Sequence, residues 1–140
     1  MTRKEGWEEK LEAYVAGLMD RPFSWGDHDC CQFARNWVAI CTGEDPTAGL
    51  LDYDSQEGAE EVLKAMGWRN PYEAMRSALG VPVPPAQARR GDVVFAHLDG
   101  GDLGTNSGAG ICLGSQSVFP GETGLVTIPT GQCARGWCIG

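Results

Sequence analysis

The residues best suited to chemistry lie in one short segment, Trp25-Gly-Asp-His-Asp-Cys-Cys-Gln-Phe33, where two adjacent cysteines follow an aspartate. The spacing of apolar residues predicts a helix that begins near Asp29, which would place Cys30 in its first turn. Unpaired backbone N–H groups at a helix start stabilise a thiolate and lower the pKa of the thiol. Cys30 is therefore a candidate nucleophile. The competing interpretation is that Cys30 and Cys31 pack beneath a sheet as small apolar residues.

A cysteine nucleophile needs a base, and the chain has two histidines, His28 and His97. His28 lies two residues before Cys30, so its side chain is not expected to reach a neighbouring strand; it is interpreted as a loop or capping residue. His97 ends a predicted strand and, in a hairpin, would lie about 5 Å from its cross-strand neighbour. It is a candidate base, and the alternative is a solvated histidine at the mouth of a loop.

The six cysteines do not form the paired CxxC pattern of a metal site. Two are adjacent in sequence, and adjacent side chains point in different directions, so they rarely hold one ion. We expect reduced, unliganded thiols, no metal and no other cofactor, and a cysteine-ligated metal site is the alternative. The cysteines are Cys30, Cys31, Cys41, Cys112, Cys133 and Cys138.

The composition describes one globular domain, 1–140, with 42% apolar and 21% charged residues. Eleven Lys and Arg against nineteen Asp and Glu give a net charge of −8. An acidic domain lacks the basic surface that binds phosphates, so nucleic acid is not an expected partner. No apolar run is long enough for a membrane span, and the N-terminus lacks the apolar stretch of a signal peptide.

The elements that must position these residues divide the chain into two halves. Apolar spacings of three and four predict helices over 3–19, 29–41, 55–66 and 70–79. Short apolar runs between turn signals predict strands over 92–98, 110–114, 116–119, 125–128 and 136–139, and the glycine-rich run 99–109 is expected to be a loop. Helices followed by an antiparallel sheet indicate the α+β class. The expected core comprises Phe33, Trp37, Val38, Val93, Phe95, Ile111 and Leu113.

Three motifs in this order resemble the NlpC-type papain-like cell-wall peptidases. They are Asp29-Cys30 at a helix start, Arg90-Gly-Asp-Val-Val-Phe95, and Gly110-Ile-Cys-Leu-Gly114. The resemblance implies a papain-like, NlpC-type core, with N-terminal helices packed on a C-terminal antiparallel β-sheet. It also implies that Cys30 is the nucleophile.

The whole chain looks more closely like a phage-tail branch of this superfamily. The features are the Asp-Cys-Cys sequence, the Thr42-Gly-Glu-Asp45 and Phe119-Pro-Gly121 turns, and Trp137. Such proteins are typically encoded among the tail-tip genes of phages, prophages and gene-transfer-agent-like particles. The resemblance therefore implies a location in the virion tail, after synthesis in the bacterial host cytoplasm.

The chain departs from the family pattern where the catalytic histidine belongs. That position falls on Gly108, and the orienting polar residue should lie on the next strand, where the chain has Ser117-Val-Phe119. A thiolate can attack a carbonyl, but the leaving amine needs a proton donor. With Gly108 there, the standard dyad is broken, although His97 could act as a migrated base.

The sequence therefore favours a structural tail-tip or tail-assembly protein with a degenerate cysteine peptidase fold over an enzyme. Its expected partners are neighbouring tail proteins, such as the hub and the tip or fibre-bearing protein. The alternative is an active cysteine hydrolase that cleaves peptidoglycan peptides with Cys30 and His97.

Overall fold

The computed structural model describes residues 1–97 and 107–140 and has the expected α+β organisation. The helices are α1 (Trp7–Leu18), α2 (Cys30–Thr42), α3 (Gln56–Met66) and α4 (Pro71–Leu79). The strands are β1 (Val93–His97), β2 (Ser107–Cys112), β3 (Gln116–Pro120), β4 (Leu125–Pro129) and β5 (Arg135–Trp137). Helices come first and strands second, as the change in apolar spacing predicts.

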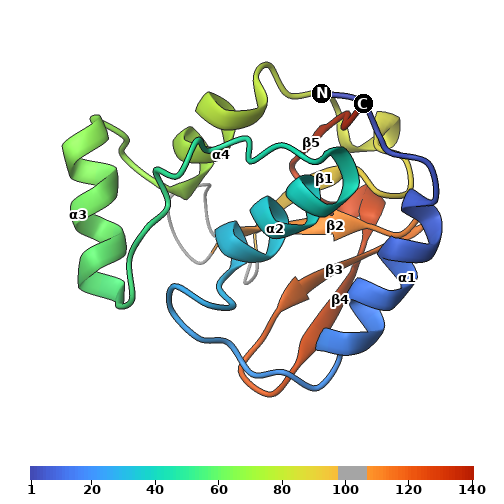
Figure 1. Ribbon diagram of the computed structural model, residues 1–140, viewed down its shortest axis with the longest axis horizontal. Coiled ribbons are helices and arrows are strands. Elements are labelled where there is room, and N and C mark those ends of the chain that lie inside the picture. The colour runs from blue at the N-terminus through green and yellow to red at the C-terminus, as the bar shows by residue number, and fades with distance from the viewer. Residues whose placement is uncertain (98–106) are drawn as a thin grey trace.

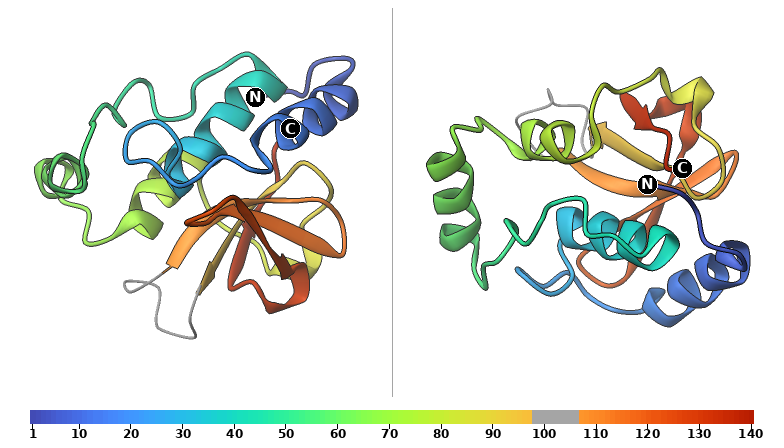
Figure 2. Two further views of the ribbon diagram at one scale, coloured as in Figure 1. Left: turned by 90° about the horizontal axis from the view of Figure 1, so that it is seen from below. Right: turned by 45° about the horizontal axis from the view of Figure 1, so that its top comes forward.

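The five strands form one antiparallel sheet in the order β4-β3-β2-β1-β5. Helices α1 and α2 lie side by side across one face of this sheet (Figure 1 and Figure 2). We call this the helix face, and the opposite one the far face. None of the helices in the described ranges has the length and apolar character needed to cross a membrane.

Helix α2 joins the two layers. Its apolar side chains recur at helical spacing, and Phe33, Trp37 and Val38 are fully buried against the helix face. The Trp37 indole N–H donates to the Gly91 carbonyl oxygen at 2.8 Å, which satisfies the one polar atom of this large side chain. The predicted core is confirmed: six of its members are buried in one cluster, and the seventh, Leu113, is partly buried against it.

Asp92 ties the chain termini to the start of β1. Its carboxylate accepts hydrogen bonds from the backbone N–H groups of Arg89 at 2.8 Å and Ile139 at 2.9 Å. The Arg3 guanidinium completes the cluster at 2.6 Å from the same carboxylate. Asp92 therefore satisfies backbone donors at the start of β1 and forms an ion pair with the N-terminal segment.

Strand β2 begins three residues earlier than the sequence predicts. The segment 107–109 was expected to belong to a glycine-rich loop, but it pairs with β1, and Ala109 is fully buried. Small residues are required here, because a side chain at Gly110 would collide with the Val118 carbonyl and the Phe119 ring. The rest of that expected loop, 98–106, lies outside the described residues.

Helix α3 stands apart from the sheet and has no buried residue (Figure 1). Its ends are well defined: the Ser55 side chain accepts from the Gly58 N–H, and Gly67 ends the helix in the left-handed region. Local capping rather than packing therefore stabilises α3. Its apolar side faces a cavity beside the start of α2.

Candidate functional site

The cavity lies at the N-terminal end of α2 and has a volume of about 470 Å³. Ligand pockets in proteins typically have volumes of roughly 300–1,000 Å³. Its walls come from the loop before α2, the segment before α3, α3 itself, the start of α4 and the ends of β2 and β3. The side chains used below are Trp25, Asp29, Cys30, Cys31, Tyr53, Glu60, Arg69 and Ser107, which all line it.

Cys30 is the first residue of α2 and reaches this cavity. The Asp29 side chain caps the helix by accepting from the Gln32 N–H at 2.9 Å. A hydrogen bond from the Cys31 thiol lowers the pKa of Cys30, and the backbone N–H groups of Ala109 and Cys31 lower it further. Burial and the Asp29 charge oppose these effects without reversing them. The direction of this pKa shift is the one expected for a cysteine in the first turn of a helix.

Cys31, the second residue of α2, has the opposite pKa shift. Its hydrogen bond to Cys30, its burial and the nearby Cys30 charge all raise the pKa of Cys31 well above its ordinary value. The pKa values of the two adjacent thiols are therefore shifted in opposite directions. The sequence did not distinguish the two cysteines in this way.

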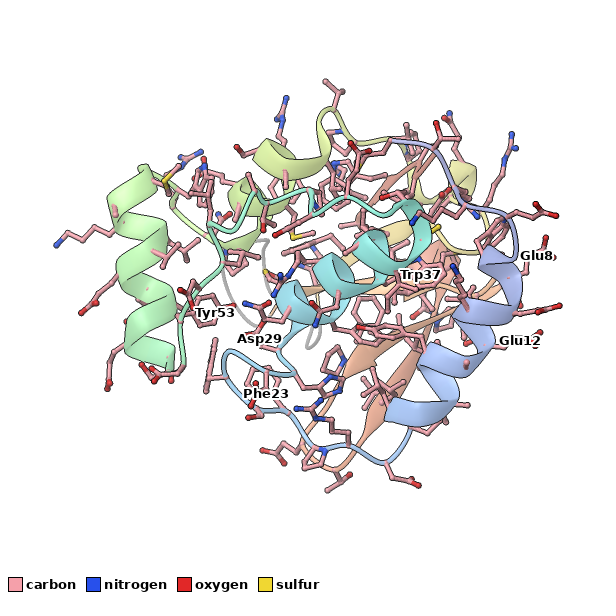
Figure 3. The ribbon with its side chains drawn as sticks, in the orientation of Figure 1. Glu8, Glu12, Phe23, Asp29, Trp37 and Tyr53 are labelled. Carbon is pink, nitrogen blue, oxygen red and sulfur yellow. The ribbon has the colours of Figure 1, made fainter. Side chains whose placement is uncertain are left out.

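Tyr53 lies beside the start of α2, close to Asp29, and both residues line the cavity (Figure 3). Burial raises the pKa of the Tyr53 hydroxyl, and its hydrogen bond to the Asp29 carboxylate raises it further, so the phenol stays protonated. Gly26 makes this approach feasible, because a Cβ there would collide with the Tyr53 carbonyl oxygen. Sequence reasoning missed Tyr53, which lies in an irregular segment with no motif to mark it.

His28 packs in the core and makes no hydrogen bond to Cys30 in the described part of the chain. Its ring lies edge-on against Phe33 and is 2% exposed, and Nε2 is buried without a hydrogen-bond partner. Burial lowers the pKa of His28, the Arg21 charge lowers it further, and Asp29 offsets part of this. Of the two interpretations of His28, a loop residue or a cap, the loop residue is confirmed: His28 lies in the loop before α2, it is buried, and Asp29 caps the helix.

His97 ends β1 on the helix face, the face that Val93 and Phe95 share, as strand alternation predicts. Its cross-strand partner is Ser107, which lines the cavity with Cys30. His97 itself is half-buried and not part of the lining, and its Nδ1 is buried without a hydrogen-bond partner. Within residues 1–97 and 107–140, no hydrogen bond joins Cys30 to either histidine.

The register of β2 decides where a side chain would point at position 108, to which the catalytic histidine maps. Gly108 pairs with Ala96 on the far face, whereas Ala109 pairs with Phe95 on the helix face. A side chain at position 108 would therefore point away from Cys30. In the stretch 117–119, where the orienting residue was expected, Ser117 is the polar residue; it pairs with Cys112 on the far face, and its hydroxyl lies 2.7 Å from Thr130 Oγ1. Neither Gly108 nor Ser117 faces the cavity.

No group of three or more His, Cys, Asp or Glu side chains converges as a metal site in the parts of the chain that the structure describes. The six cysteines are free thiols, and Cys138 is the exposed one among them.

A family model described as a domain of unknown function, DUF6950, matches residues 2–139 of the chain. The curated proteins contain no match. Among solved structures, the chain is similar to RipD from Mycobacterium tuberculosis, described as a non-catalytic NlpC/p60 domain protein with an adaptation to peptidoglycan binding. The identity is 19% and the TM-score 0.48, over 97% of this chain and 99% of that one.

Proposed function

We propose that this chain, which belongs to the DUF6950 family, is a structural component of a phage tail tip or tail assembly with a degenerate NlpC-type cysteine peptidase fold. The resemblance of its motifs to the phage-tail branch of that superfamily supports the proposal. The particle is that of a phage, a prophage or a gene-transfer-agent-like element, and the protein is made in the cytoplasm of the bacterial host.

The observation that carries the proposal is the environment of the Cys30 thiol. Cys30 is the first residue of α2, between Asp29 and Cys31, and lines the cavity with both of them. Peptide hydrolysis needs an acid that protonates the leaving amine. Neither His28 nor His97 is hydrogen-bonded to Cys30 within the described residues, so no histidine is placed there to protonate the leaving amine.

The proposed partners are the neighbouring tail proteins, the hub and the tip or fibre-bearing protein. The net charge of −8 favours partner surfaces that carry basic residues, because complementary charge speeds and orients association.

Two experiments test this proposal. Purified protein incubated with peptidoglycan fragments should release no stem peptides, and Cys30→Ala should behave in the same way. Gold-labelled antibodies should mark one end of the tails in particles induced from the bacterium that carries the gene. Particles without label, in a preparation whose other tail proteins are detected, would contradict the tail location.

The second candidate is an active cysteine hydrolase of peptidoglycan that uses Cys30 with His97. The lowered pKa of Cys30 and its access to the cavity favour this candidate. It requires the His97 ring to turn toward the cavity, past its partner Ser107. Peptide release that is lost in both Cys30→Ala and His97→Gln would establish the hydrolase and overturn a purely structural role.

A further inference from the structure

Helix α3 leaves its apolar side uncovered. Ala59, Val62 and Leu63 line the cavity of about 470 Å³, yet no residue of α3 is buried. Further apolar side chains in the lining are Leu51 and, on α4, Ala74. Amphipathic helices normally bury their apolar stripe, because removing that surface from water is favourable. The cavity is thus an apolar groove that the described residues leave unfilled.

An aromatic pair adds to the apolar lining of this groove. Trp25 and Phe23 both line it, and their rings meet edge to face with centroids 4.9 Å apart. Trp25 is 39% exposed, whereas Trp37 and Trp137 are buried in the core. Accessible tryptophans in pockets are often the residues that contribute most to protein binding.

The groove is bordered by acidic residues. One of its walls comes from the segment 46–63, which contains no Lys or Arg. Among the described lining residues, Arg69 is the basic one, and it forms an ion pair with Glu73 at 3.1 Å. A basic partner is therefore attracted to this surface and an acidic one is repelled, with both effects weakening as salt rises. The acidic residues of the wall are Asp52, Asp54, Glu57, Glu60 and Glu61.

These charges extend beyond the cavity itself. Glu60 lines it, but Asp54 and Glu57 do not. The backbone of Asp54 lies against Gly26 in the loop before α2, so the two acidic segments meet at this edge. Asp29 also lines the cavity, but its carboxylate already accepts from the N–H groups of Gly26 and Gln32. A ligand confined to the cavity cannot use the outer carboxylates, whereas a longer partner segment can.

We propose that this groove is the docking site for a basic amphipathic helix of a partner protein. The apolar side of that helix packs against α3 and Trp25, and its Lys or Arg side chains lie over the acidic border. The 11-residue length of α3 suits side-by-side helix packing. The inference rests on the proposed function in one respect, that the protein acts by binding a neighbouring protein. It does not involve the chemistry of Cys30.

The test uses the full chain and a labelled synthetic peptide of leucine and lysine, with leucine at helical spacings of three and four. Two matched peptides are the controls. One has glutamate in place of lysine, and the other has the same composition in an order that forms no apolar side. Fluorescence anisotropy measures binding at low and high salt. We expect the first peptide to bind about tenfold more tightly than either control, because it combines the apolar side with complementary charge.

Variants locate the bound peptide. Trp25→Ala and Leu63→Ser should each weaken binding about tenfold, as the loss of an interface anchor does. Val81→Ser is the matched control, because Val81 is 80% exposed and does not line the cavity. Glu60→Lys should weaken binding several-fold at low salt, and Glu8→Lys, the same change in charge on α1 away from the cavity, should do so much less (Figure 3). Thermal unfolding verifies that each variant is folded.

Four results would contradict the proposal. They are no binding of the leucine–lysine peptide, equal affinity in wild-type protein and folded Trp25→Ala, equal weakening by Glu8→Lys and Glu60→Lys, and displacement of the peptide by peptidoglycan fragments. The last result would assign the groove to the cell wall. Labelled tails without peptide binding would contradict the groove alone, and peptide binding without labelled tails would contradict the tail location alone.

Discussion

Cys30 packs against the core cluster that contains Ala109, one residue along β2 from the position where the NlpC-type motif would place its histidine. Adjacent strand residues point to opposite faces of a sheet. Any side chain at Gly108 therefore lies on the far face, away from Cys30. The register of β2, and not only the loss of one residue type, separates the thiol from a histidine at that position.

This register predicts where an imidazole could reach the cavity. Ser107→His places a histidine on the helix face at the cavity wall, so Cys30 should be alkylated faster at mildly acidic pH as a thiolate–imidazolium pair forms. Gly108→His is the matched control and should leave the rate unchanged. Alkylation by iodoacetamide across pH, with thermal unfolding to verify folding, measures both. A faster reaction in Gly108→His would show that the β2 register is wrong.

Trp37→Ala should reduce the free energy of unfolding by about 3–5 kcal/mol, the usual range for the loss of a large buried aromatic side chain. The side chain is fully buried between α2 and the sheet, and its indole N–H is bonded to Gly91. Trp25→Ala is the control, because Trp25 is 39% exposed and should contribute much less. Urea unfolding compares the two variants, and similar losses would argue against the central position of Trp37.

Asp92→Ala should be strongly destabilising, by about 3–5 kcal/mol, because it leaves the nearly buried Arg3 guanidinium and two backbone N–H groups without their acceptor. Asp45→Ala is a matched carboxylate deletion in a more exposed turn, where the carboxylate accepts from Thr47 and lies 3.6 Å from Arg35. Its cost should be smaller, since water can replace the lost contacts. Chemical unfolding of both variants tests this order.

The stability of the protein should fall as the pH drops below the ordinary histidine pKa of 6.5, in part because of His28. Burial lowers the pKa of His28 in the folded state, so the unfolded chain binds this proton first. Acid then favours unfolding until the pH also passes the folded-state pKa, below which this contribution stays constant. The contribution is absent well above pH 6.5, where both states are neutral.

His28→Phe keeps an aromatic ring against Phe33 and removes the titrating group. Urea midpoints at about pH 7.5 and about pH 5.5 should differ less in this variant than in the wild-type protein. An equal acid-induced loss in both proteins would mean that His28 does not contribute to it.

Much of the fold could be predicted from local sequence. Helix α2 follows from apolar residues at helical spacing between a capping Asp29 and a terminating Gly43, and the structure has both caps. Strand β1 follows from alternation, which placed Val93, Phe95 and His97 on one face. These features depend on residues close in sequence, where backbone geometry and side-chain periodicity are sufficient.

The sequence by itself determined the α+β order, the core and the position of Cys30 at a helix start. The tertiary structure decided which face of β2 meets that helix, because Gly108, Ala109 and Gly110 have almost no side chain to reveal a buried strand. It also decided that Tyr53 covers Asp29 and that α3 closes one side of the cavity. These contacts join segments far apart in the chain, so only the packing of the whole domain specifies them.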